Sequence, residues 1–139
     1  MKDIKVAVMN TSKEITDMLC EVLGDEGFET ISTFTYAFKD NQSLFDEYVK
    51  VNKPDVIVYD IAPPYRENYF FFEQLYSRAS AKSVPFVLTT TNKDALESFV
   101  GNTVTLELIG KPYDLQEIID AVEKAFTKKL SAKLQSQVK

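Results

Sequence analysis

The chain has 139 residues, 45% of them hydrophobic and 27% charged, which is typical of one globular domain with no bilayer-spanning segment. Its net charge of -5 argues against direct binding of nucleic acid. It has no histidine and one cysteine, Cys20, which excludes Cys/His zinc sites and histidine-activated nucleophiles.

Strand-like and helix-like segments alternate along the chain. The strands are expected at residues 4–9, 28–34, 55–60, 84–90 and 104–110. The helices are expected around residues 15–23, 42–51, 68–80, 93–100 and 114–126. Several strands are nearly continuous apolar runs, which indicates a parallel sheet covered by helices on both faces. The sequence therefore predicts a doubly wound α/β domain over residues 1–126.

Two helix starts carry capping signals. The segment from Thr11 to Glu14 has the form of a capping box, in which the Glu14 side chain reaches back to the helix start. Asp114 is expected to cap the last helix, with Glu117 at the reciprocal position.

Residues 127–139 turn basic and polar, yet Phe126, Leu130, Leu134 and Val138 recur every four residues. This spacing is enough to continue the last helix. Two interpretations stay open: a frayed, solvated end, or a helical extension that docks on the domain or on a second copy of the chain.

Polar residues follow the predicted strands where each one ends. They are Asn10 and Thr11, Asp60, the threonines 89–91, and Lys111. In open parallel sheets, ligands bind beyond the carboxyl ends of the strands. A carboxylate with an ammonium group and a hydroxyl beside it can accept and hold a phosphoryl group, so we expect the site here.

Three segments in this order resemble the receiver domain of bacterial two-component response regulators over roughly residues 4–126. They are PDVIVYDIAPP, VPFVLTTT and GKPYDLQEIIDAVEKA. The resemblance implies a flavodoxin-like fold of five strand–helix units. It implies Asp60 as the phosphoacceptor, Lys111 as the phosphate-binding residue, and Thr90, in preference to Thr89, as the switch hydroxyl. It also implies a cis bond before Pro112.

The resemblance further implies a sensor histidine kinase or a phosphotransfer protein as partner, and a Mg²⁺ ion at the acceptor. The family's acidic pair after the first strand is here Asn10 and Thr11. The remaining ligands are Asp60, the backbone oxygen of Ala62, and the neutral oxygens of Asn10 or Thr11. This shell has fewer charges than Mg²⁺ prefers, so we expect weak binding or none.

Two other positions depart from the family. The segment YRENYFFF replaces its small turn after Pro64, and we expect most of these aromatic residues in the core, with one or two exposed. Leu108 holds the place of its aromatic switch residue.

The leading hypothesis is therefore a cytoplasmic, non-enzymatic receiver domain that is phosphorylated on Asp60 and switches a protein-interaction face. The alternative is a degenerate receiver that acts as an interaction or dimerisation module without phosphorylation. A dehalogenase-like phosphatase needs a second aspartate where Ala62 stands, and a flavodoxin-like carrier needs a phosphate-cradling loop that the segment MNTSKE does not offer.

Overall fold

The computed structural model describes residues 3–78, 81, 83–96, 105–107 and 112–137. Its sheet is parallel and five-stranded, in the order β2-β1-β3-β4-β5. The strands are β1 (Lys5–Asn10), β2 (Glu29–Phe34), β3 (Val56–Asp60), β4 (Phe86–Thr90) and β5 (Thr105–Glu107). The predicted α/β class and parallel sheet are confirmed.

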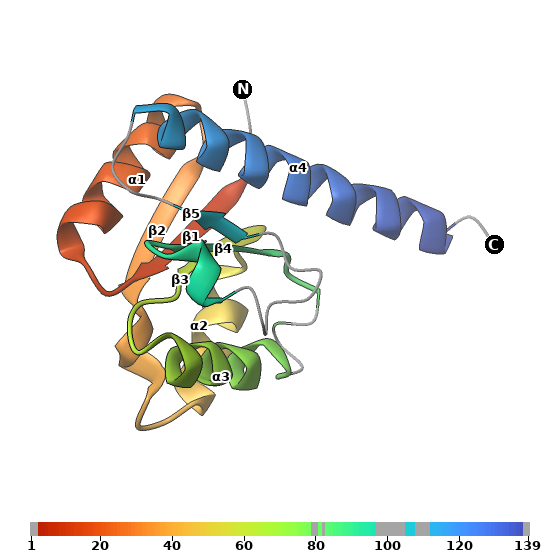
Figure 1. Cartoon of the computed structure of the whole chain (residues 1–139). Coiled ribbons are helices and arrows are strands. Elements are labelled where there is room, and N and C mark those ends of the chain that lie inside the picture. Colours follow the sequence, from red (N-terminus) through yellow and green to blue (C-terminus); the bar gives the residue numbers. More distant parts are fainter. Residues whose placement is uncertain (1–2, 79–80, 82, 97–104, 108–111, 138–139) are drawn as a thin grey trace.

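Helices cover both faces of the sheet (Figure 1). They are α1 (Lys13–Asp25), α2 (Ser43–Asn52), α3 (Tyr65–Tyr76) and α4 (Pro112–Gln137), with short 3-10 turns η1 (Thr35–Phe38) and η3 (Lys93–Ala95). The helix predicted around 93–100 begins as the turn η3, and its second half lies outside the described residues.

One face of the sheet packs against α1 and α4. Side chains alternate sides along a strand, so Val58 points to this face while its neighbour Tyr59 points to the other. Leu19 from α1 and Ile118 from α4 meet Val58 in a continuous buried cluster. Both helices therefore cover the same face of β3.

The opposite face packs against α2 and α3 and is rich in aromatic side chains. The Tyr59 and Phe72 rings lie 5.2 Å apart between centroids, and Phe72 contacts Phe86 edge-on at 5.3 Å. Phe45 from α2 is fully buried in the same cluster. Each such ring removes a large apolar area from water, so this face anchors α3 to the sheet.

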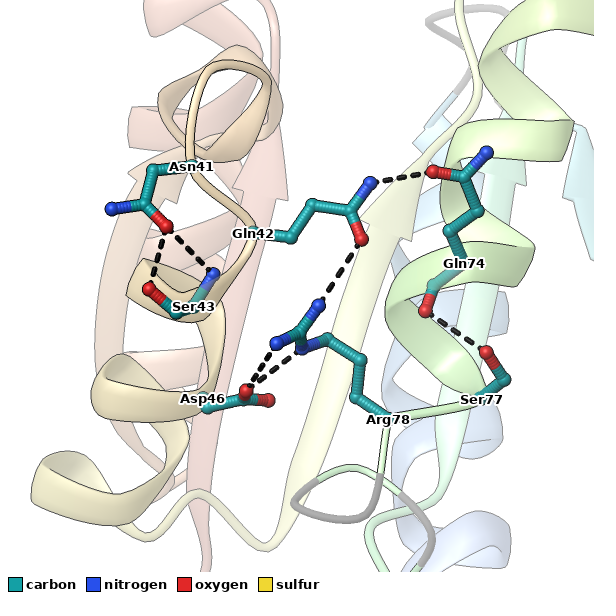
Figure 2. A network of polar contacts seen from close by, with 7 residues as sticks. All are labelled: Asn41, Gln42, Ser43, Asp46, Gln74, Ser77 and Arg78. Carbon is teal, nitrogen blue, oxygen red and sulfur yellow. Dashed lines mark hydrogen bonds and ion pairs between the residues drawn. The ribbon is translucent and has the colours of Figure 1, made fainter.

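A polar network joins α2 to α3 on the surface of this layer (Figure 2). The Arg78 guanidinium, just after α3, donates to Asp46 Oδ2 at 2.8 Å through Nε and to Gln42 Oε1 at 3.2 Å. Gln42 in turn donates to Gln74. Both helices are therefore fastened to each other as well as to the sheet.

Both predicted helix caps are wrong in register. Ser12, not Thr11, caps α1, because its hydroxyl accepts from the Ile15 amide at 3.3 Å. The helix α4 begins at Pro112, so Asp114 lies inside its first turn. Proline suits this position because its ring holds a helical φ and the first turn needs no amide donor.

The helix α4 runs through Gln137 and projects beyond the sheet (Figure 1). Lys129 lies 3.9 Å from Asp55 at the start of β3, and after it Leu130 and Leu134 are 44% and 62% exposed. The division of the chain into a domain of residues 1–126 and a separate C-terminal segment of residues 127–139 stays a prediction. Within the described ranges, no helix combines the length and apolar character needed to cross a bilayer.

Candidate functional site

The described residues that the sequence predicts for the site lie at or just beyond the carboxyl ends of β1, β3 and β4. Asn10 ends β1, Asp60 ends β3, and Thr89 and Thr90 end β4. Asp60 is paired with Thr89 in the β3–β4 register. Because paired residues of adjacent strands point to the same side, the Asp60 and Thr89 side chains share one face, and Thr90 takes the other.

The two threonines therefore do different things. Thr89 Oγ1 donates to Asp60 Oδ1 at 2.7 Å, whereas Thr90 Oγ1 donates to the main-chain oxygen of Ile61 at 2.9 Å. The sequence favours Thr90 as the hydroxyl partner of Asp60, but the structure places Thr89 against the carboxylate. Thr90 instead holds the loop that follows β3, and its role as a switch residue stays a prediction.

Burial governs the electrostatics of the acceptor carboxylate. Loss of solvation raises the pKa of Asp60, because the charged form is disfavoured away from water. The Thr89 hydrogen bond acts in the opposite direction on this pKa, since it stabilises the carboxylate. The charged form of Asp60 therefore depends on a hydrogen-bond donor more than the charged form of an exposed aspartate does.

Three of the four predicted magnesium ligands, Asp60, Asn10 and Ala62, already accept hydrogen bonds from protein donors. Asn10 Oδ1 accepts from the Ser12 amide at 3.0 Å, and the Ala62 carbonyl accepts from Asn68 Nδ2 at 2.7 Å. Thr11 is exposed. Among the described residues, no three Asp, Glu, Cys or His side chains are grouped as a metal site. One carboxylate among neutral oxygens supplies less negative charge than Mg²⁺ prefers, so these residues do not fit a magnesium site.

Asn68 is a site residue that sequence reasoning missed. It lies one turn into α3, and its amide must present its NH₂ group because the partner is a carbonyl oxygen. Its only sequence signal is an amide side chain six residues after Ala62, which gives no hint of a contact across the intervening prolines.

The aromatic residues after Pro64 divide as expected. Tyr69 and Phe72 are buried, Tyr65 and Phe71 pack against the same core from partly buried positions, and Phe70 is 45% exposed. The Tyr65 hydroxyl lies 3.3 Å from Thr91 Oγ1, which joins the start of α3 to the end of β4.

Other predicted features lie outside the described residues. Lys111, the expected phosphate-binding residue, and Leu108, at the expected aromatic switch position, are among them. The predicted cis bond between Lys111 and Pro112 falls there as well.

No family model matches the chain, and no curated protein matches it. The chain does match solved structures. NtrX from Brucella abortus superposes with a TM-score of 0.70 at 17% identity, over 99% of this chain and 29% of that one. The chemotaxis response regulator CheY4 of Vibrio cholerae gives 0.63 at 19% identity, over 87% and 99%. A sensor protein from Polaromonas sp. JS666 gives 0.72 at 18%, over 92% and 99%.

This chain therefore spans less than a third of the NtrX chain and matches the other two along almost their whole length. At these identities the likeness concerns the fold. The parallel α/β sheet agrees with it. The chain has the fold of response-regulator receiver domains.

Proposed function

We propose that this chain acts in two-component signal transduction as a receiver-fold interaction module whose contacts do not depend on phosphorylation of Asp60. One observation carries the proposal: Asp60 is the only carboxylate among the predicted cation ligands, and the oxygens of Asn10, Ala62 and Asp60 already accept hydrogen bonds from Ser12, Asn68 and Thr89. Phosphoryl transfer to an aspartate develops charge that a nearby cation normally offsets. Without that offset, transfer to a buried carboxylate is slow.

The proposed partner is a sensor histidine kinase or a phosphotransfer protein in the cytoplasm, and the module has no catalytic turnover of its own. The fold supports this choice, since CheY4 is a response regulator and the Polaromonas structure is a sensor protein. Partner binding would use surface that stays the same whether Asp60 is charged or not. We expect equal affinity for the partner in the parent chain and in Asp60→Ala.

The second candidate is the phosphoacceptor itself. Asp60 retains part of its exposure at the strand end and has a hydroxyl donor at 2.7 Å. In this reaction a carboxylate oxygen attacks the phosphorus of a phosphohistidine, the P–N bond breaks, and an acyl phosphate forms. Thr89, whose hydroxyl already lies against the carboxylate, and Lys111 are its proposed partners for the transferred group.

Intact-mass measurement after incubation with acetyl phosphate, with and without Mg²⁺, separates the two candidates. The interaction module predicts no added phosphoryl group in either condition. Addition of one phosphoryl group that disappears in Asp60→Ala would support the phosphoacceptor and refute the first proposal.

A gain-of-function variant makes a negative result interpretable. The double substitution Asn10→Asp with Thr11→Asp restores the family's acidic pair at the end of β1. If the acidic pair is the missing part, this variant becomes phosphorylated in a Mg²⁺-dependent manner while the parent chain does not. Equal labelling of both proteins would show that the neutral pair is no obstacle.

A further inference from the structure

The loop between β3 and α3 is held by side chains on both sides. Its first two carbonyls are acceptors: Ile61 O bonds to Thr90 Oγ1 at 2.9 Å, and Ala62 O bonds to Asn68 Nδ2 at 2.7 Å. The Ile61 amide donates to Thr89 O at 2.8 Å. Strand β4 therefore fixes the start of the loop, and α3 fixes its next residue.

A bound cation would organise the same part of the chain in a different way. It would draw the Asp60 carboxylate and the Ala62 carbonyl towards one positive centre. Here two neutral donors supply that attraction separately, Thr89 for the carboxylate and Asn68 for the carbonyl. Neither donor requires removal of a strongly hydrated ion from water, so the arrangement persists at any cation concentration.

We propose that Asn68 is a positioning residue that substitutes for a divalent cation, holding the β3–α3 loop in one conformation whether or not a cation is present. This inference rests on the proposed function, because a constant loop is what a phosphorylation-independent module requires. The inference names Asn68 as the residue that keeps the loop conformation constant. Asn68 acts through the Ala62 main chain and contacts no reacting atom.

Asn52 offers a matched control on another helix. Its Nδ2 donates to the main-chain oxygen of Tyr48 at 2.9 Å, and like Asn68 it is half-buried. The same substitution at Asn52 therefore removes the same kind of hydrogen bond, at the end of α2, where it does not touch the β3–α3 loop.

Amide hydrogen exchange of the full chain tests the proposal, with Mg²⁺ as the probe. In Asn68→Ala, exchange at the amides of residues 61, 62 and 65–69 should accelerate by up to about tenfold, as expected for loss of one hydrogen bond, while β1 keeps its rates. In the parent chain, millimolar Mg²⁺ should leave these rates unchanged. Asn52→Ala, the matched control, should accelerate exchange only near the end of α2.

Asn68→Asp keeps the shape of the side chain but replaces the donor with a carboxylate. Its loop should exchange faster than in the parent chain and slow again when Mg²⁺ is added, because the new carboxylate joins Asp60 and Ala62 as a cation ligand.

Three results would overturn the proposal. These are unchanged loop exchange in Asn68→Ala, faster exchange spread over the whole chain in both Asn68 variants, or a Mg²⁺ response of the parent loop as large as that of Asn68→Asp. These outcomes are independent of the acetyl phosphate measurement. An unphosphorylated chain with a loop insensitive to Asn68 refutes this inference alone, whereas a phosphorylated parent chain refutes the proposed function.

Discussion

Thr89 and Asp60 face each other across β4 and β3, with the threonine hydroxyl 2.7 Å from the carboxylate. The neighbouring Thr90 is equally buried but points to the opposite side of the sheet and bonds to main chain. Two adjacent threonines of the same strand thus differ in what they stabilise, one a charge and the other a loop.

Replacement of these threonines by valine should separate the two roles. Thr89→Val removes the donor to the carboxylate, so the pKa of Asp60 should rise further above its usual value. Thr90→Val should leave the Asp60 titration unchanged. It should lower the free energy of unfolding by about 1–2 kcal/mol, since the buried Ile61 carbonyl loses its donor. Carbon-13 NMR of the Asp60 carboxyl and urea unfolding provide the measurements, and equal titrations in both variants would contradict the assignment.

The raised pKa of Asp60 predicts a pH-dependent effect of Asp60→Asn. In the folded chain the carboxyl binds its proton more tightly than in the unfolded chain, where its pKa is near the ordinary 3.8. Stability from this group is therefore lost as pH rises from 3.8 through the raised pKa. Asparagine does not ionise, so Asp60→Asn does not lose this stability. The free energy of unfolding of Asp60→Asn should therefore exceed that of the parent chain by more near neutral pH than below pH 3.8.

Urea unfolding of both proteins across this pH range measures the effect. An advantage of Asp60→Asn that shrinks as pH rises would have the wrong sign and contradict the prediction.

The two phenylalanines of α3 predict contrasting stability effects. Phe72 is 2% exposed and contacts the rings of Tyr59 and Phe86, so Phe72→Ala should reduce the free energy of unfolding by about 3–5 kcal/mol. Phe70 is 45% exposed on the same helix, and Phe70→Ala should cost less than about 1 kcal/mol. Chemical denaturation followed by circular dichroism measures both, and similar losses would show that α3 packs differently.

The exposed leucines of α4 predict association of two copies of the chain. Leu130 and Leu134 lie beyond the ion pair of Lys129 with Asp55, on a helix that projects past the sheet. A projecting helix of this kind gains stability by burying such side chains against a partner. Sedimentation velocity should show a concentration-dependent dimer for the parent chain and a monomer for Leu130→Gln with Leu134→Gln. If both proteins sediment as monomers, the prediction is wrong and the two leucines are exposed to solvent in solution.

The fold could be predicted from the sequence where local pattern decides it. The apolar run before Asp60 predicts the third strand to within one residue of its observed start at Val56. The start of α3 at Tyr65 was predicted three residues late, because the run of polar and aromatic residues there has no clear helical period.

The site was less predictable because its contacts depend on three-dimensional register. The choice between Thr89 and Thr90 follows from how β3 and β4 pair, and that pairing has no local signature. The Asn68 contact with Ala62 depends on the path of the loop between them. Residue types alone could therefore place the site at the sheet edge but could not assign its hydrogen bonds.

The position of α4 also has a consequence for synthesis of the chain. Ile118 and Val122 cover the sheet face that includes Val58 and Val87, yet they are translated after every strand of that sheet. Until they leave the ribosome, an apolar sheet surface stays open to solvent and to other nascent chains. The domain can therefore close its core only after residue 122 has left the ribosome.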